Sequence, residues 1–174
     1  MRRPFTALIQ SAAVAAVLSA ALSHNAAAAA TEPSTDPLAD PAPCLAAVDA
    51  DDADRIIASC SALVDSEKTL RADRIKALVA RAHAYDGKEM IDRAIGDYDA
   101  ALRLDPTLAD IFNARGELWR RKGDRPRALA DFDAAIKLNP QHQAARANYK
   151  SLALELERLG AEMAIKNKRD RPLK

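Results

Sequence analysis

The sequence predicts an all-α protein of about seven helices, paired into hairpins that stack as a solenoid. The first observation is a 34-residue unit that occurs twice without a gap, at residues 75–108 and 109–142. A repeat of this length is typical of helical pairs that cannot bury their apolar faces alone and therefore pack on their copies. The second observation is an apolar stripe at helical spacing after residue 140. This stripe predicts a C-terminal helix that caps the last copy.

Residues 1–30 predict an export signal. Arg2 and Arg3 precede an apolar stretch from Phe5 to about Leu22, and a run of alanines ends at Ala30. A charged start, a short apolar core and small residues before the cleavage point are typical of secretory signals. We therefore expect export by the general secretory route to the periplasm, with no stable membrane insertion after cleavage. A twin-arginine signal is the weaker alternative, because the rest of that motif is missing, and a retained N-terminal anchor is another.

The segment after the signal contains both cysteines. Residues 31–42 are rich in Pro, Thr, Ser and Asp and predict a disordered lead-in, and residues 43–65 predict a degenerate helical pair. Cys44 falls in its first helix and Cys60 in its second, one repeat length before Ala94. In an exported chain two cysteines favour a disulfide, and two small buried side chains are the alternative. A metal site is not expected, because the pair lacks a CxxC element and the histidines lie elsewhere.

The two copies agree at small, aromatic, charged and proline positions. In register these are Arg81 and Arg115, Ala82 and Gly116, Tyr85 and Trp119, Ala94 and Ala128, Tyr98 and Phe132, Ala101 and Ala135, and Pro106 and Pro140. The spacing of the large, small, aromatic and proline positions resembles the tetratricopeptide repeat family, whereas Arg81 and Arg115 stand where that family usually has leucine. The resemblance implies a right-handed solenoid in one domain, residues 43–165, that ends in a capping helix at 140–163. Residues 166–174 follow as a basic tail, which we expect to be solvated.

Two charged positions recur inside the repeats. Arg81 is followed by Asp97, and Arg115 by Asp131, at the same spacing of sixteen residues. We hypothesise an ion pair between the two helices of each repeat, with the groups within about 6 Å of each other. Separate solvated charges are the alternative, because exposed pairs contribute little stability.

Two prolines predict where helices begin. Pro106 follows Asp105, and Pro140 follows Asn139. Aspartate and asparagine are favoured caps, and proline is favoured at the first helical position. We therefore expect a new helix to begin at each of these prolines.

The resemblance also implies a binding surface. In the tetratricopeptide repeat family the first helix of each pair lines a groove that binds proteins or peptides. The corresponding positions here are Lys76, Val79, His83, Asp86, Asp110, Asn113, Glu117, Arg120 and Arg121. Their mixed charges favour a polar peptide as the ligand. The family's basic clamp for C-terminal carboxylates is not expected, because Val79 and His83 occupy its first positions.

Composition and motifs argue against other classes of function. The 174 residues contain 26 bases and 25 acids, so the chain lacks the basic footprint of a nucleic-acid binder. No GxSxG, HExxH or glycine-rich phosphate loop occurs, and we expect no enzyme, no cofactor and no metal. The sequence thus predicts a non-catalytic protein–protein interaction module of the bacterial cell envelope. A self-associating structural protein and an accessory subunit of a cell-wall enzyme are the alternatives.

Overall fold

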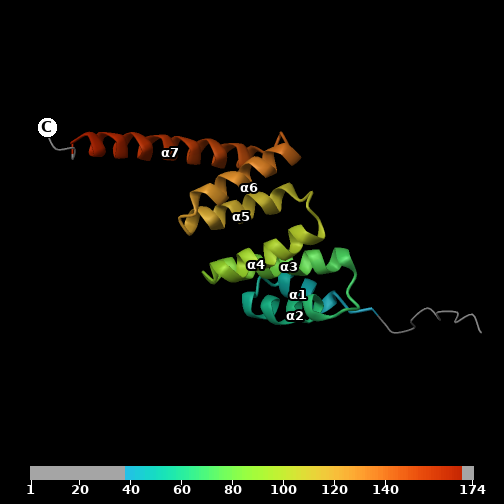
Figure 1. Ribbon diagram of the computed structural model, residues 1–174. Helices are drawn as coiled ribbons and strands as arrows, with labels where there is room; N and C mark the ends of the chain where they lie inside the picture. Colours follow the sequence, from blue (N-terminus) through green and yellow to red (C-terminus); the bar gives the residue numbers. More distant parts are fainter. Residues whose placement is uncertain (1–37, 170–174) are drawn as a thin grey trace, which may run out of the picture. The chain divides into compact units, whose positions relative to one another are not determined.

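The computed structural model describes residues 38–169. These residues belong to a single compact unit. The predicted signal, most of the predicted lead-in and the last five residues of the predicted tail lie outside the described residues. Between residues 38 and 169 the chain forms seven α-helices and no strand (Figure 1). The predicted all-α architecture of helical hairpins is confirmed.

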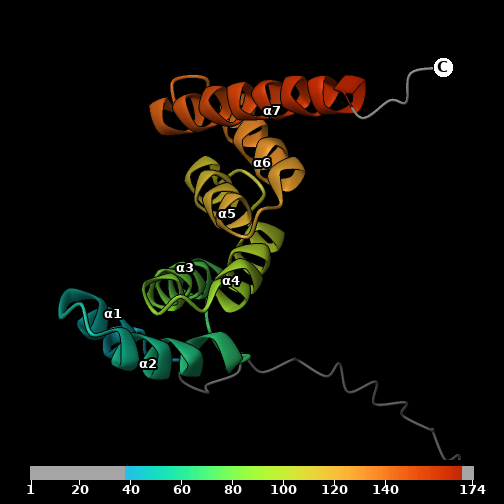
Figure 2. The same cartoon turned by 90° about the vertical axis from the view of Figure 1, so that its left-hand side faces the viewer.

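The helices pair in the order of the chain. The three hairpins are α1 (Ala42–Asp49) with α2 (Ala53–Asp65), α3 (Arg71–Gly87) with α4 (Ile91–Leu104), and α5 (Ala109–Arg121) with α6 (Arg125–Leu138). Successive hairpins meet through α2 with α3 and through α4 with α5. The last helix, α7 (Gln143–Arg169), packs on α6 and also contacts α5 (Figure 2). Each hairpin is therefore stabilised by its neighbours along the chain.

The small positions of the repeat allow the helices to cross closely. Ala82 and Ala94 are fully buried in the first copy, and Ala128 is fully buried in the second. A Cβ atom on Gly116 would lie 2.7 Å from Cε1 of Phe132 and 3.2 Å from the carbonyl oxygen of Ala128. Because Phe132 is itself 0% exposed, it has no space into which to move. The glycine is thus required by the crossing of α5 and α6.

The turn between the two helices of a repeat contains a residue with left-handed backbone geometry. In the second copy this residue is Gly123, with φ of +80°, and in the first copy it is Glu89, with φ of 58°. Glycine adopts this conformation without strain, whereas a residue with a Cβ loses roughly 1 kcal/mol of conformational free energy. The hairpin geometry is therefore kept in the first copy despite a less suitable residue.

The prolines do not begin helices, so that prediction is wrong. Helix α5 begins at Ala109 and α7 at Gln143, in each case three residues after the proline. Instead, Oδ1 of Asp105 accepts a hydrogen bond from the backbone N–H of Thr107 at 2.9 Å. Asn139 makes the same turn two residues on, at 3.1 Å. These side chains stabilise a turn at the place where the sequence predicts a helix cap.

Helix α7 extends past the predicted capping segment at residues 140–163, and it includes residues 166–169 of the predicted tail. Its first half contacts the last hairpin: Leu152 is fully buried, and Tyr149 and Leu156 pack with Phe132. The position equivalent to Gly116 in α7 is the exposed Lys150. A long charged side chain at this position is unsuited to a further close helix crossing. This feature is typical of a terminal capping helix.

Candidate functional site

An apolar hollow lies between helices α1, α3 and α5, and we call it the inner-face hollow. Its volume is 390 Å³, and its lining consists of Val48, Ile75, Lys76, Val79, Ala80, His83, Leu108, Asp110 and Ile111. Two further hollows, of 160 and 400 Å³, also have Val48 and Ala80 in their linings. The three hollows therefore adjoin one another, and Leu45 extends the apolar lining along α1.

Helical spacing explains why this surface is left open on α3. Lys76, Val79, Ala80 and His83 follow one another at three, one and three residues, which places them on one side of the helix. The opposite side contains Leu78 and other buried residues that face the core. On this side Val79 and Ala80 are only partly buried, and Val48 of α1 remains 40% exposed. The surface is suited to burying apolar groups of a ligand.

One polar pair lies at the edge of the hollow. Nδ1 of His83 lies 3.1 Å from the hydroxyl oxygen of Tyr98, and the two rings meet edge to face with centroids 5.7 Å apart. Tyr98 comes from α4 and is only 1% exposed. Burial raises the pKa of its phenol well above the usual range, and the carboxylates of Asp86 and Glu117 add to the effect. The neutral phenol therefore fixes the orientation of the imidazole at the edge of the hollow.

Four of the nine predicted groove residues line the inner-face hollow, namely Lys76, Val79, His83 and Asp110. The other five do not line it. Most of the lining is apolar, so the expectation of a polar peptide, which was based on mixed charges, does not fit this hollow. Sequence reasoning missed Val48, Ile75, Ala80, Leu108 and Ile111. Ile75 and Ala80 could have been found from their place on α3, but nothing in the degenerate first pair indicated Val48.

The five other predicted groove residues connect helices to one another. Arg121 of α5 forms an ion pair with Asp86 of α3. Asn113 donates a hydrogen bond to Glu117 at 2.9 Å. The amide of Asn148 on α7 donates to the oxygens of both, at 3.0 Å to Asn113 and 2.8 Å to Glu117. Arg120 of α5 bonds Glu155 of α7 at 3.2 Å. These side chains therefore hold α3, α5 and α7 in register.

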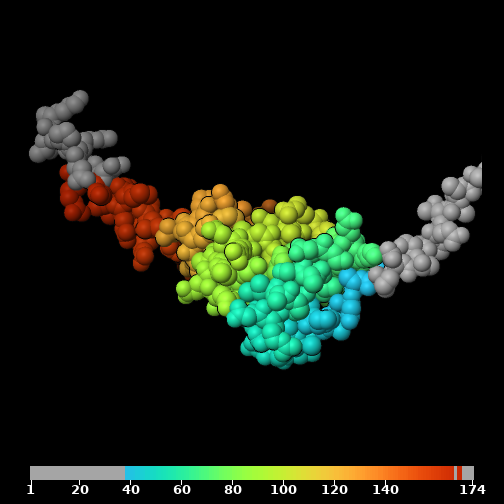
Figure 3. Space-filling model, turned by 90° about the horizontal axis from the view of Figure 1, so that it is seen from below, coloured from blue at the N-terminus to red at the C-terminus, as the bar shows by residue number. Residues whose placement is uncertain are grey.

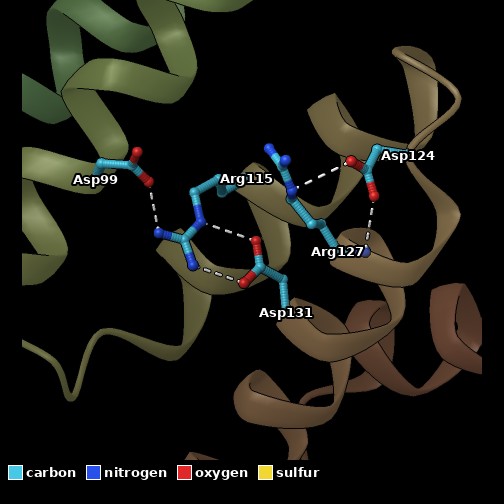
Figure 4. Close-up of polar contacts among 5 residues, drawn as sticks. All are labelled: Asp99, Arg115, Asp124, Arg127 and Asp131. Atoms are coloured by element: carbon cyan, nitrogen blue, oxygen red, sulfur yellow. Dashed lines mark hydrogen bonds and ion pairs between the residues drawn. The ribbon is translucent and has the colours of Figure 1, made fainter.

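Each repeat contains the predicted ion pair between its two helices. Arg81 donates two hydrogen bonds to the carboxylate of Asp97, both at 2.7 Å. Arg115 donates to Asp131 in the same way, at 2.8 and 2.6 Å (Figure 4). Both aspartates are buried. The hydrogen bonds to these carboxylates raise the pKa of each guanidinium, so the hypothesis of an Arg–Asp pair in each repeat is confirmed.

Each of these arginines also reaches back to the preceding hairpin. Nη1 of Arg81 donates to the hydroxyl of Ser61 on α2 at 2.7 Å. Nη1 of Arg115 donates to Asp99 on α4 at 2.6 Å (Figure 4). Figure 4 also shows Asp124 at the start of α6, whose carboxylate accepts from the backbone N–H of Arg127 at 3.1 Å. The arginines thus join neighbouring hairpins and are not available to a ligand.

The first hairpin is cross-linked close to the inner-face hollow. Cys44 of α1 and Cys60 of α2 form a disulfide, with their Cα atoms 4.7 Å apart. Cys44 also lines the hollow of 160 Å³ next to Val48. The bond therefore fixes α1, which is only eight residues long, at the edge of the binding surface.

A second open region, of 640 Å³, lies between α5 and α7. Its lining includes three basic residues, Arg120, Lys150 and Arg158, and one acid, Glu155. Hydrogen bonds from Arg125 and Arg120 lower the pKa of Glu155, which therefore stays ionised and neutralises part of the basic charge. This region is more polar than the inner-face hollow and shares no residue with it.

Residues 38–169 contain neither a cluster of metal ligands nor a membrane-spanning helix. In this range no group of three or more His, Cys, Asp or Glu side chains could hold a metal ion. Nor does any helix within the same residues combine the length and the apolar character needed to cross a membrane.

Comparison with known proteins identifies the repeat. Residues 109–142 match the family model described as tetratricopeptide repeat. This segment of the chain is a tetratricopeptide repeat. The matched segment is the second copy, α5 with α6, and the first copy has the same hairpin and the same Arg–Asp pair. A search of curated proteins gave no match.

Several solved structures share the fold. The TPR domain of Arabidopsis OM64 is 20% identical, with a TM-score of 0.57, over 64% of this chain and 89% of that one. The first TPR of Spaghetti (RPAP3), bound to an HSP90 peptide, is 16% identical, with a TM-score of 0.59, over 70% and 99%. The TPR domain of P58(IPK) is 22% identical, with a TM-score of 0.63, over 74% of this chain but only 35% of that one. At these identities the likeness concerns the fold.

Proposed function

We propose that this protein is a non-catalytic interaction module of the bacterial cell envelope, which binds an apolar segment of a partner in the inner-face hollow. The observation that carries the proposal is the continuous apolar lining left open by three helices, represented by Val48, Val79 and Ile111. Single exposed apolar residues are ordinary on protein surfaces, but a concave apolar surface with a few polar groups at its edge is typical of a binding site.

The similar structures support a peptide as the ligand. The first TPR of RPAP3 was solved with an HSP90 peptide, and the second TPR domain of human RPAP3 with an HSP70 peptide. The second of these is 19% identical to this chain, with a TM-score of 0.56. For this protein we infer a different ligand chemistry, because apolar groups dominate the lining and Lys76 is the only lysine or arginine in it. A partner segment with two or three apolar side chains would bury them there.

The cell-envelope location rests on the predicted signal and is supported by the disulfide, since such bonds persist in oxidising compartments. The full-length chain, expressed in a bacterial host, should be recovered from the periplasmic fraction with a mass that has lost about 30 residues. Recovery of the uncleaved chain from the cytosol would contradict this part of the proposal.

The binding role is tested by a pull-down from an envelope extract of the source organism. The bait is the tagged full-length chain as processed by the host, and the test variant is Val48→Glu, which places a charge in the hollow. The matched control is Ala46→Glu on the same helix, because Ala46 is exposed and does not line the hollow. We expect a partner that the parent and the control retain and that the test variant loses. Equal capture by all three proteins would reject the hollow as the binding site.

A further inference from the structure

We propose that the inner-face hollow also accepts the free end of α7 from a second copy of this chain, so that copies join head to tail. This inference rests on the proposed function, since it uses the same hollow, and it names an occupant. The contact would join two different surfaces, one near each end of the helical stack.

The end of α7 has an apolar face without a partner. The stripe that begins at the buried Leu152 continues at helical spacing through Leu156, Leu159 and Met163. Leu156 still packs against the last hairpin, but Met163 is 65% exposed. From Gly160 to Arg169 every residue whose exposure is described is exposed. Figure 3 shows this part of α7 extending away from the atoms of α4, α5 and α6.

The shapes of the two surfaces are suited to each other. An amphipathic helix commonly binds in a groove between helices by placing apolar side chains from successive turns into it. Leu159 and Met163 lie one turn apart on α7 and can supply two such anchors. Methionine is flexible and adapts to irregular apolar surfaces, such as the hollow between Val48, Val79 and Ile111.

The first hairpin, which adjoins the hollow, and the end of α7 carry opposite charges. Residues 42–66, which form α1 and α2, contain five acids, Asp49, Asp51, Asp52, Asp54 and Asp65, against the single base Arg55, a formal charge of −4. The end of α7 contains Lys166, Lys168 and Arg169, and no acid follows Glu162 within the helix. Asp51 and Lys88 both line the hollow of 400 Å³, and Lys88 pairs with Asp54 at 2.8 Å, which leaves the other four acids of the hairpin to face α7. Complementary charges favour encounter in the orientation that brings α7 to the first hairpin.

A contact between two different surfaces has a direct consequence for assembly. An open assembly keeps a free hollow on the copy at one end and a free α7 on the copy at the other, so growth continues unless a ring closes. Because the charges lie at exposed positions, the association should weaken as salt is added. A partner segment that binds in the hollow should compete with it.

The test uses two variants of the full-length chain, each of which blocks one surface. Val48→Lys places a cation in the hollow, opposite the basic end of α7. Met163→Glu removes an anchor from α7 and places an acid opposite the acidic hairpin. The matched controls are Ala46→Lys and Ala161→Glu, which change exposed positions outside the hollow and off the α7 stripe. Sedimentation velocity over a range of protein and salt concentrations gives the association state, and circular dichroism confirms that each variant is folded.

We expect the parent and both controls to associate increasingly with concentration. Each blocking variant should associate at least about tenfold more weakly than the parent. An equimolar mixture of the two blocking variants should form a dimer that does not grow, because one intact hollow then meets one intact α7. A parent that stays monomeric overturns the inference. A parent that associates while the mixture does not also overturns it, since that result indicates a symmetric contact. A monomeric parent whose Val48→Glu variant still loses a captured partner would leave the proposed function standing alone.

Discussion

The buried pair of Arg115 and Asp131 gives a quantitative test of how the repeats are held together. We consider the substitution Asp131→Ala. The side chain of Asp131 is 8% exposed and that of Arg115 is 19% exposed, so the guanidinium would lose its main partner in a largely dry environment. Breaking a buried pair by removing one partner costs about 3–5 kcal/mol. Arg115 keeps Asp99 at 2.6 Å and some contact with water, which reduces the expected cost to about 2–3 kcal/mol.

The matched comparison is Asp99→Ala. Asp99 contacts the same guanidinium but is 39% exposed, and an exposed pair contributes only about 0.5–1 kcal/mol. A third protein, with Arg115→Met and Asp131→Leu together, tests whether the loss comes from an unpaired charge. Replacing a whole buried pair with apolar residues is often close to neutral, so the double variant should be more stable than Asp131→Ala alone.

The assay is urea unfolding followed by circular dichroism, with thermal melting as a second measurement. For a protein of this size the Asp131→Ala variant should melt about 4–12 °C lower than the parent. Equal losses for Asp131→Ala and Asp99→Ala would refute the argument from burial. A double variant no more stable than Asp131→Ala would show that the cost arises from packing and not from the unpaired guanidinium.

Three further predictions follow from single features of the structure. Gly116→Ala should lower the free energy of unfolding by about 1–2 kcal/mol, because the added Cβ overlaps a buried ring. Gly96→Ala, in open space on α4, should raise it by up to about 1 kcal/mol. Changes of the same sign in urea unfolding would contradict this prediction. Reduction of the disulfide between α1 and α2, which spans 16 residues, should lower the stability of the chain by about 3 kcal/mol; an unchanged melting temperature with both thiols alkylated would contradict it. Because burial raises the pKa of Tyr98 in the folded state, its contribution should be complete below about pH 10, where the unfolded phenol titrates, and should fall as the pH rises further. The difference in melting temperature between the parent and Tyr98→Phe should therefore be constant below about pH 10 and should shift against the parent above it; a difference that is constant at every pH would argue against the effect.

The fold could be predicted because the same physical constraints occur twice at one period. Small residues at helix crossings, aromatic residues beside them and an Arg–Asp pair recur at a fixed offset in both copies. Residues that recur at the same place in both copies are therefore the ones that the fold requires, whereas residues that differ are not. The pairing of Arg81 with Asp97 was predictable for the same reason, and the structure places these groups within hydrogen-bonding distance.

The sequence by itself determined the hairpins, their order and the core of each repeat, because these depend on spacing within a single unit. Only the tertiary structure decided which inner residues are free. Arg121 forms an ion pair with Asp86 of another hairpin, and Asn113 accepts a hydrogen bond from Asn148 of α7. The spacing along one helix shows which side a residue is on, but not what the crossing of a distant helix places beside it. For that reason the apolar hollow at Val48 and the free end of α7 could be identified only once the helices were assembled.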